Sequence, residues 1–315
     1  MKILVTGGAG FIGSALANHL ASLGHRVRVI DDLSSGDPSA LDTAVAFTRG
    51  DVRDIPKLWT LLREVEVVFH LAARVSVSES ILYPVDYNEV NVGGTVSLMT
   101  AARDAGVRRV VLASSGTVYG DQDEQPVKET ALVRPPNPYA VSKIASEYYL
   151  SALGALYDIE VVMLRIFNAY GPGQAVPPSH PPVIPHFIRQ ALAGSTPTIF
   201  GSGKQTRDFI HISDVVNALT TAGLTNNVNG FILNIGTGRE VSINDLLKKI
   251  ESLLGRRVLS LHNPGQSGGV SRLVAETELA RKVLGFQAKV EIDEGLRLML
   301  RHYEKMASSS SEAGA

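Results

Sequence analysis

Tyr139 and Lys143 form the pair in this sequence whose types and spacing most directly suggest catalysis. They lie in the segment NPYAVSK, residues 137–143, in which the asparagine can cap a helix and the proline suits its first turn. A helix places side chains four residues apart on one face. Because a nearby ammonium group stabilises a phenolate, the pair could supply a general base whose pKa lies below the usual value of about 10.

Two hydroxyl groups complete this candidate catalytic set. The apolar run 108–113 is followed by the sequence SSGT, so a strand that ends here would place a hydroxyl beside the reacting oxygen of a substrate. A Tyr-x-x-x-Lys spacing by itself occurs by chance in many helices. In combination with the strand-end hydroxyls, it predicts catalytic roles for Ser115, Thr117, Tyr139 and Lys143.

A glycine-rich turn lies near the start of the sequence. Residues 5–13, VTGGAGFIG, follow a predicted strand and open a predicted helix. Glycine lets the backbone turn tightly and approach a pyrophosphate, to which the helix N-terminus presents unpaired N–H groups and a positive dipole end. A glycine triplet alone is weak evidence, because glycine turns are common. With the acidic residues described next, it predicts dinucleotide contacts from Gly7, Gly10, Phe11, Ile12 and Gly13.

The second predicted strand, 26–30, is followed by the acidic pair Asp31-Asp32, at the distance from the glycines where a carboxylate binds ribose hydroxyls. The pair has no adjacent arginine and should repel a 2′-phosphate, so NAD is favoured over NADP. A turn with helix-capping aspartates is the alternative interpretation. The residues that follow extend the expected cofactor-binding set to Ser34, Ser35 and Gly36.

Two further strand ends could border the cofactor. Asp51 and Val52 follow the third strand and suit an adenine-edge contact, although a plain turn aspartate is the alternative. His70 ends an apolar strand, and we interpret it as a core histidine with satisfied hydrogen bonds rather than a ligand or base. The residues beyond it would let a cofactor pass closely: Leu71, Ala72 and Ala73.

The elements that must hold these groups alternate along the first half of the chain. Strands are predicted at 2–5, 26–30, 44–48, 65–70, 108–113 and 159–165, and helices at 11–23, 55–64, 88–105 and 138–156. The uniformly apolar strands suit a parallel sheet covered on both faces. The sequence therefore predicts an α/β fold with a Rossmann-type doubly wound parallel sheet.

The pattern changes after residue 167. Residues 168–185 contain six prolines, which neither a helix nor a central strand tolerates, so we expect a long functional loop. Beyond it, helices are expected at 186–193, 214–222, 243–254, 277–284 and 293–303, with a strand at 196–200. We predict an NAD-binding Rossmann domain at 1–168, to which later segments return, a smaller and mainly substrate-binding α/β domain at 169–306, and a disordered tail at 307–315.

Composition excludes several classes of function. The net charge is −1, so the basic surface of a nucleic-acid or membrane-binding protein is missing. The chain has no cysteine, which excludes disulfides, thiolate metal sites and cysteine nucleophiles. Its start lacks a signal-peptide pattern, and no run approaches the ~20 apolar residues that span a bilayer. We expect a cytoplasmic protein without a metal site.

These motifs resemble those of the NAD-dependent sugar epimerase/dehydratase family, the extended short-chain dehydrogenases, and the likeness is closest to its UDP-glucose 4-epimerases. The resemblance covers about residues 1–305. Its motifs are specific in combination: TGGAGFIG at 6–13, HLAA at 70–73, NVGGT at 91–95, SSGTVYG at 114–120, YAVSK at 139–143, RIFN at 165–168 and RDFIH at 207–211.

Carried over to these positions, the resemblance implies that Tyr139 is the base and that Lys143 binds the nicotinamide ribose. Ser115, with Thr117 nearby, would hydrogen-bond the 4-oxygen of the sugar. Asn91 and Phe167 would border the cofactor. Asn168 and Arg207 would hold the diphosphate. The uridine would be bound by Val183, Thr198 and Phe200.

The implied reaction is 4-epimerisation of a UDP-sugar, either UDP-glucose/UDP-galactose or a UDP-N-acetylhexosamine. Tyr139 would remove the 4-hydroxyl proton while C4 is oxidised by tightly bound NAD. The planar 4-keto sugar would present its other face, and return of hydrogen would invert C4.

Two positions depart from the family pattern. Relatives with this activity often carry an arginine and, three residues later, an aspartate where this sequence has Gln266 and Gly269. Arg272 is the candidate to supply the missing charge, and without it the affinity for the diphosphate or the preference for a nucleotide is in doubt. Leu273 falls where a bulky side chain in relatives limits the N-acetyl group, which leaves N-acetylhexosamines open.

Three alternatives stay open. A sugar dehydratase of the same family would carry an Asp-Glu pair just after the strand-end hydroxyl, where this chain has Gly116 and Thr117. A 4-ketosugar reductase would consume reduced cofactor, and the acidic pair argues against NADPH. A silent dinucleotide-binding protein would have no need of the catalytic set.

A homodimer is also expected. Helices 88–105 and 138–156 each have an apolar face, and in relatives such a pair docks against its copy.

Overall fold

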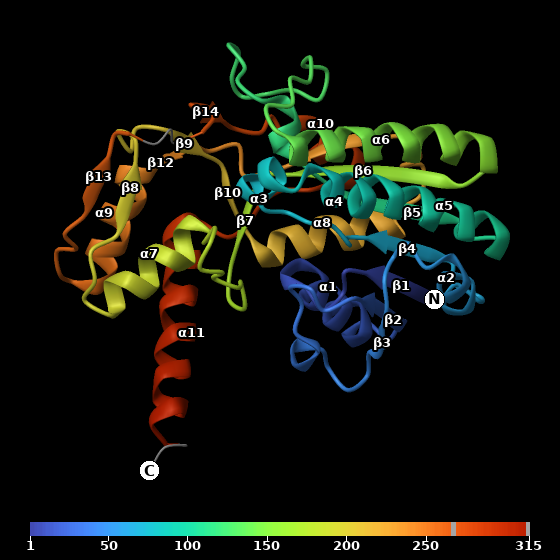
Figure 1. The fold of residues 1–315 in the computed structure, drawn as a ribbon, viewed down its shortest axis with the longest axis horizontal. Helices are drawn as coiled ribbons and strands as arrows, with labels where there is room; N and C mark the ends of the chain where they lie inside the picture. The colour runs from blue at the N-terminus through green and yellow to red at the C-terminus, as the bar shows by residue number, and fades with distance from the viewer. Residues whose placement is uncertain (266–268, 313–315) are drawn as a thin grey trace.

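Seven parallel strands form the centre of the molecule, a computed structural model that describes residues 1–265 and 269–312 (Figure 1). Their order across the sheet is β11-β6-β5-β4-β1-β2-β3, so the order reverses between β1 and β4. This arrangement confirms the predicted Rossmann-type sheet, in which ligands bind at the point of reversal. The strands are β1 (Lys2–Thr6), β2 (Arg26–Asp31), β3 (Ala46–Arg49), β4 (Val67–His70), β5 (Arg109–Ser115), β6 (Glu160–Ile166) and β11 (Ile232–Ile235).

Helices cover both faces of this sheet (Figure 1). Ile3 and Val5 of β1 belong to one apolar core and Leu4 to the other, and all three are fully buried. A strand buried on both faces has to be apolar throughout, which is the pattern of the sequence. One face is covered by α1 (Phe11–Ser22), α8 (Ile212–Leu224) and α10 (Glu278–Leu284), the other by α2 (Ile55–Leu61), α5 (Gly94–Ala105) and α6 (Pro138–Tyr157).

A smaller α/β part lies beside the sheet and has its own apolar core (Figure 1). Its helices α7, α9 and α11 pack around Phe187, Leu246 and Met299. The parallel pair β7–β10 lies between the two parts. The elements are α7 (Val183–Leu192), α9 (Ile243–Leu254), α11 (Ile292–Glu312), β7 (Asn168–Tyr170), β10 (Phe209–His211), the pair β8 (Thr198–Phe200) and β13 (Leu261–Asn263), and the sheet β12 (Val241–Ser242), β9 (Thr206–Arg207) and β14 (Arg272–Leu273).

Several elements differ from the expectation. The strand β11 was not predicted, and it pairs with β6 at the edge of the main sheet. The helix expected at 88–105 begins with a π-helical segment, η2 (Asn88–Gly93). Short helices that the sequence analysis did not predict are η1 (Pro38–Ala40), α3 (Val77–Leu82), α4 (Pro84–Tyr87) and η3 (Gly116–Tyr119).

Helix α11 continues to Glu312, so residues 307–312 of the expected disordered tail are helical. Alanine and serine can extend a helix that earlier turns have already nucleated, because each added residue gains a backbone hydrogen bond. Residues 313–315 lie outside the described residues. The division of the chain into two domains stays a prediction. Across 1–265 and 269–312, no helix is long and apolar enough to cross a membrane.

Candidate active site

The glycine turn between β1 and α1 lies at the point where the strand order reverses. Gly7 has a φ of 66°, and a Cβ there would lie 2.6 Å from the backbone nitrogen of Ala72. A Cβ on Gly13 would lie 2.1 Å from the carbonyl oxygen of Gly7. Both positions therefore require glycine, one for the left-handed turn and one so that α1 can begin against it. The result is a backbone-lined cradle at a helix N-terminus, which suits a pyrophosphate.

The acidic pair at the end of β2 holds the adjoining turns. The Asp31 carboxylate accepts the N–H groups of Ala9 at 3.0 Å and Leu33 at 2.9 Å. Asp32 accepts the N–H of Ser34 at 2.9 Å. Both aspartates also line the cavity described next. The turn-holding interpretation and the ligand-binding interpretation therefore apply to the same side chains.

Asp51 already has a partner inside the protein. Its carboxylate accepts from Nη2 of Arg53 at 2.6 Å, and this side-chain hydrogen bond holds the pKa of Asp51 below its usual value. Asp51 and Val52 nevertheless line the cavity.

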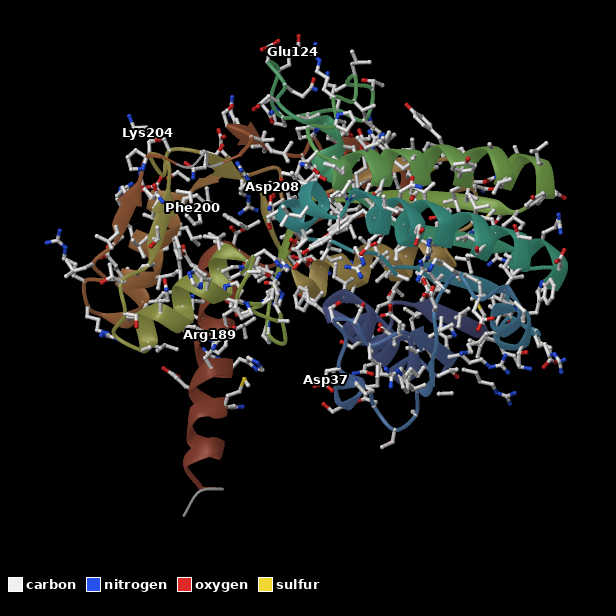
Figure 2. All side chains as sticks on the ribbon, in the orientation of Figure 1. Asp37, Glu124, Arg189, Phe200, Lys204 and Asp208 are labelled. Carbon is white, nitrogen blue, oxygen red and sulfur yellow. The ribbon has the colours of Figure 1, made fainter. Side chains whose placement is uncertain are left out.

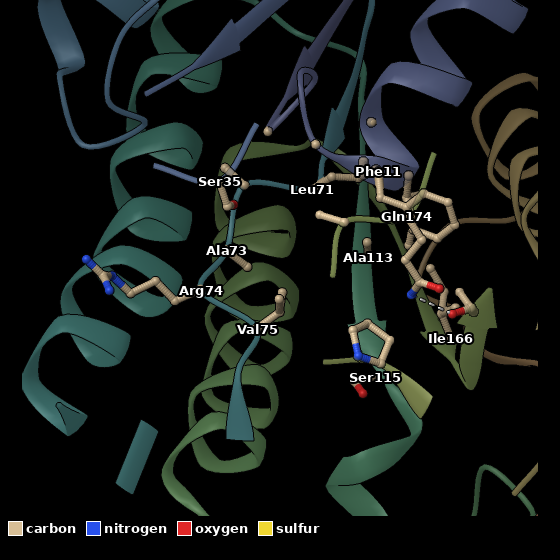
Figure 3. Close-up of a pocket in the computed structure, with 18 of the residues that line it drawn as sticks. Phe11, Ser35, Leu71, Ala73, Arg74, Val75, Ala113, Ser115, Ile166 and Gln174 are labelled. Atoms are coloured by element: carbon tan, nitrogen blue, oxygen red, sulfur yellow. Dashed lines mark hydrogen bonds between the residues drawn. The ribbon is translucent and has the colours of Figure 1, made fainter. Parts of the chain in front are cut away.

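One cavity of about 510 Å³ runs from the glycine turn to the loop after β7. Figure 3 shows Ala113 and Ser115 on β5, with Ala73 from the segment after β4 and Gln174 from the loop after β7. The predicted residues that line it are Gly7, Gly10, Phe11, Ile12, Gly13, Asp31, Asp32, Ser34, Ser35, Asp51, Val52, Leu71, Ala72, Ala73, Ser115, Tyr139, Lys143, Phe167, Asn168 and Val183.

Helix α6 brings Tyr139 and Lys143 to the end of β5. The Oδ1 atom of Asn137 accepts the N–H of Ala140 at 3.0 Å, so the predicted cap sets where the helix begins. The Lys143 ammonium donates to the carbonyl oxygen of Ala113 at 2.9 Å. Ser115 accepts the Thr117 hydroxyl at 2.9 Å, which leaves the Ser115 proton available to another oxygen.

Burial opposes the charged forms of both catalytic candidates. It raises the pKa of Tyr139 to about 12, against the hydrogen bond to Ser115, and lowers the pKa of Lys143 to about 8, against the carboxylate of Glu147. Both shifts follow from the loss of water around a charge. A phenolate at Tyr139 therefore needs positive charge beside it at the moment it forms.

The predicted residues outside this lining have other contacts. Asn91 is buried, and its Nδ2 donates to Ser142 Oγ at 2.8 Å and to the carbonyl oxygen of Arg74 at 3.0 Å, so it ties α6 to the segment after β4. Phe200 is half exposed on β8 in the smaller part (Figure 2). The predicted residues outside the lining are Gly36, Asn91, Thr117, Thr198, Phe200, Arg207 and Arg272.

The arginines of the smaller part differ from what was expected. Arg272 does not line the cavity, and its guanidinium binds both oxygens of Glu240 at 2.7 Å across the β14–β9–β12 sheet. Arg207 donates to the carbonyl oxygens of Thr206 at 2.8 Å and Val270 at 2.7 Å. A Cβ added at Gly269 would lie 3.4 Å from Nη2 of Arg207. Gln266 lies outside the described residues.

His70 is a core histidine, as interpreted from the sequence. Its Nδ1 lies 2.8 Å from the hydroxyl of Thr6 and its Nε2 lies 3.0 Å from that of Thr95. Burial lowers its pKa to about 3, so the ring is neutral. In the described part of the chain, no cluster of histidine and acidic side chains could hold a metal ion.

Most of the distal wall of the cavity could not be predicted from the sequence. Gln174, Pro177 and His180 come from the proline-rich loop, whose role was expected but whose contacts could not be assigned. Asp208, which lies between the two parts (Figure 2) and is fully buried, was not predicted either. The Asp208 carboxylate accepts the N–H groups of Thr237, Gly238 and Ala275 at 2.8–3.2 Å. Its place in the RDFIH motif was the available signal.

Comparison with known proteins gives consistent results. Residues 3–236 match the model of the NAD dependent epimerase/dehydratase family. A UDP-glucose 4-epimerase of Mycolicibacterium smegmatis is 41% identical over 304 residues, covering 94% of this chain and 96% of the relative. A UDP-glucose 4-epimerase solved with UDP-glucose, from Thermotoga maritima, superposes with a TM-score of 0.93 at 33% identity, covering 98% and 100% of the two chains. A UDP-glucose 4-epimerase of Thermus thermophilus solved with NAD has a TM-score of 0.90 at 34% identity, covering 96% and 99%.

Proposed function

The chain belongs to the NAD dependent epimerase/dehydratase family, and we propose that it is a nucleotide-sugar 4-epimerase acting on UDP-glucose and UDP-galactose. The observation that carries this proposal is that Ser115, Tyr139 and Lys143 line the same cavity as the glycine cradle. Binding of a dinucleotide alone would not require that catalytic set. Relatives that share almost the whole length of the chain are named for this activity.

The cavity fits NAD. Gly7, Gly10 and Gly13 line the cavity with backbone alone, which suits a pyrophosphate, and Asp31 and Asp32 offer carboxylates to ribose hydroxyls. The same negative charges disfavour the 2′-phosphate of NADP. NAD bound here would accept the hydride from C4 of the sugar and return it to the same carbon.

The residues of the chain move the proton and hold the oxygen. Tyr139 takes the proton of the 4-hydroxyl, and Ser115 donates a hydrogen bond to the same oxygen. The ammonium of Lys143 stabilises the phenolate. Tyr139 returns its proton after the keto sugar has rotated within the cavity and presents its other face. Because Gln174, Pro177 and His180 line the wall beyond, the loop that carries them sets the room for this turn.

The remaining substrate contacts are proposals from the family resemblance. Asn168 and Val183 line the cavity, which supports contacts of Asn168 with the diphosphate and of Val183 with the uridine. Thr198, Phe200 and Arg207 lie in the smaller part, beyond the lining. Arg272 also lies outside the lining and pairs with Glu240, so its contact with a diphosphate would require that ion pair to open. Leu273 is buried in an apolar cluster that also holds Tyr119 and Phe167. N-acetylated sugars stay open as a second substrate, because the family resemblance places a bulkier side chain at this position in relatives.

We expect the purified protein, without added cofactor, to convert UDP-glucose into a 4-epimer of unchanged mass. Proton NMR and mass spectrometry of the products measure this, with UDP-N-acetylglucosamine in parallel. Loss of one water would identify a dehydratase, and turnover only with reduced cofactor on a keto sugar would identify a reductase. An inert protein that carries NAD would contradict the assignment of the substrate.

We further infer a homodimer through α5 and α6, which lie side by side on one face of the sheet (Figure 1). Helix α6 exposes the apolar side chains Val141, Tyr148, Tyr149 and Leu156 over 48–77% of their surface. Sedimentation at micromolar concentration should give twice the mass of the chain, and Tyr149→Asp should shift it toward the monomer. A monomeric wild-type protein would contradict the inference.

A further inference from the structure

Helix α6 carries a third polar residue on the face that bears Tyr139 and Lys143. Glu147 follows Lys143 by one turn and is only 1% exposed. Its carboxylate accepts from Nε of Arg165 at 3.0 Å and from Nη2 at 2.7 Å. Arg165 lies on β6 and is 3% exposed. A buried, bidentate ion pair therefore joins α6 to the neighbouring strand.

The same carboxylate also holds the strand that carries the catalytic hydroxyl. Ser114 Oγ donates to Glu147 Oε1 at 2.5 Å, and the Lys143 ammonium donates to the carbonyl oxygen of Ala113 at 2.9 Å. Ser115, the next residue of β5, lowers the pKa of Tyr139 against the effect of burial. Lys143 and Glu147, one turn apart on α6, thus hold Ala113 and Ser114, the two residues of β5 that precede Ser115.

Arg165 is fixed from its other side. Its guanidinium carbon lies 4.8 Å from the centre of the Tyr119 ring, and the Tyr119 hydroxyl donates to Asn234 Oδ1 at 2.7 Å. A buried ion pair contributes little to folding by itself, because apolar residues of similar size often serve as well. Its connection to the end of β5 therefore calls for a functional explanation.

We propose that Glu147 and Arg165 are positioning residues: their ion pair fixes the end of β5 against α6, and the charge of Glu147, partly offset by that of Arg165, sets how firmly Lys143 holds its proton beside Tyr139. This inference rests on the proposed function. Neither side chain lines the cavity, so both act through the residues that do. Other titratable groups surround this cluster. Near Lys143 they are Tyr139 and His70 of β4, and Tyr87 of α4 packs against Tyr139. Near Arg165 they are Tyr119 and Glu129.

The signs of the electrostatic effects make the proposal testable. Burial lowers the pKa of Lys143, and the negative charge of Glu147 raises it again. Removal of that charge should therefore let Lys143 lose its proton at a lower pH. Removal of the Arg165 charge leaves the carboxylate unneutralised, so Lys143 should keep its proton to a higher pH.

The experiment compares Glu147→Gln with Arg165→Gln in the full-length protein with its NAD. In the pH profile of kcat for 4-epimerisation, the alkaline limb should move by about one pH unit or more, downward in E147Q and upward in R165Q. KM for the UDP-sugar should change little. Ultraviolet titration of tyrosinate, with and without Tyr139→Phe, gives a readout that does not depend on turnover.

Two outcomes would overturn the proposal: both variants shift the limb in the same direction, or both lose activity without any shift. Bound NAD and thermal unfolding are measured for each variant. If either variant does not fold, Ser114→Ala is the substitute test, because it removes the hydrogen bond to Glu147 and leaves both charges in place. Its kcat should fall about 10-fold with KM unchanged. An unchanged kcat would refute the positioning role. Should the wild type lack epimerase activity, the proposed function fails, while the tyrosinate titration still tests the ion pair.

Discussion

The Tyr139→Phe variant should lose about a thousand-fold in turnover while it keeps its fold and its bound NAD. The substitution removes only the phenolic oxygen, the atom that takes and returns the proton of the sugar. The ring itself stays packed edge-on against Tyr87, with 6.4 Å between the ring centres, so the cavity wall keeps its shape. Conversion of UDP-glucose followed by NMR, together with NAD released on denaturation, measures both halves of this prediction.

Tyr157→Phe is the matched control. It makes the same chemical change at the end of the same helix, where the ring contacts Arg103 rather than the cavity. Its turnover should equal that of the wild type. If the Tyr139 variant were equally active, the proton would have to go to another group, and the proposed chemistry would be wrong whatever the fold.

The second large effect is expected from Gly13→Ala, which should abolish retention of NAD. The new methyl group would lie 2.1 Å from the carbonyl oxygen of Gly7 and 2.7 Å from Cα of Gly8. These are backbone atoms, so the contact can be relieved only if α1 moves away from the turn and opens the cradle. Such overpacking costs about 1–3 kcal/mol or more. NAD content after purification and the Tm measure the result.

Gly93→Ala provides the comparison. Gly93 has a helical φ of −58°, and the nearest atom to its Cβ would be the carbonyl oxygen of Asn88 at 3.9 Å. This variant should purify with normal NAD content. If Gly13→Ala did the same, the cradle would not be the site of the pyrophosphate.

The Rossmann part could be predicted from the sequence because its signals are local. Uniformly apolar strands indicate burial on both faces of a sheet, and the glycine spacing indicates a turn packed against a helix. The spacing of Tyr139 and Lys143 predicts that they share one face of a helix. The strand β11 could not be predicted in this way. It spans only Ile232–Ile235, and its role depends on pairing with β6, far away along the chain.

The partners of two side chains near the candidate site could not be predicted for the same reason. Arg272 was expected to be available for a phosphate, but three short strands bring Glu240 within 2.7 Å of it. Glu147 follows Lys143 by one helical turn, but its ion-pair partner, Arg165, comes from strand β6 and cannot be identified from the spacing. Side chains whose partners come from distant segments have no signal in a single sequence.

The return of β11 to the main sheet has a consequence for how such an enzyme can change over evolutionary time. A chain cut after residue 168 would lose α8 from one face and leave β6 with an unpaired edge, which is a template for aggregation. The two halves therefore cannot be inherited as separable modules, joined and exchanged between genes. The proline-rich loop after β7 lines the cavity and contributes no strand to the main sheet, so changes in the cavity would disturb the sheet least there.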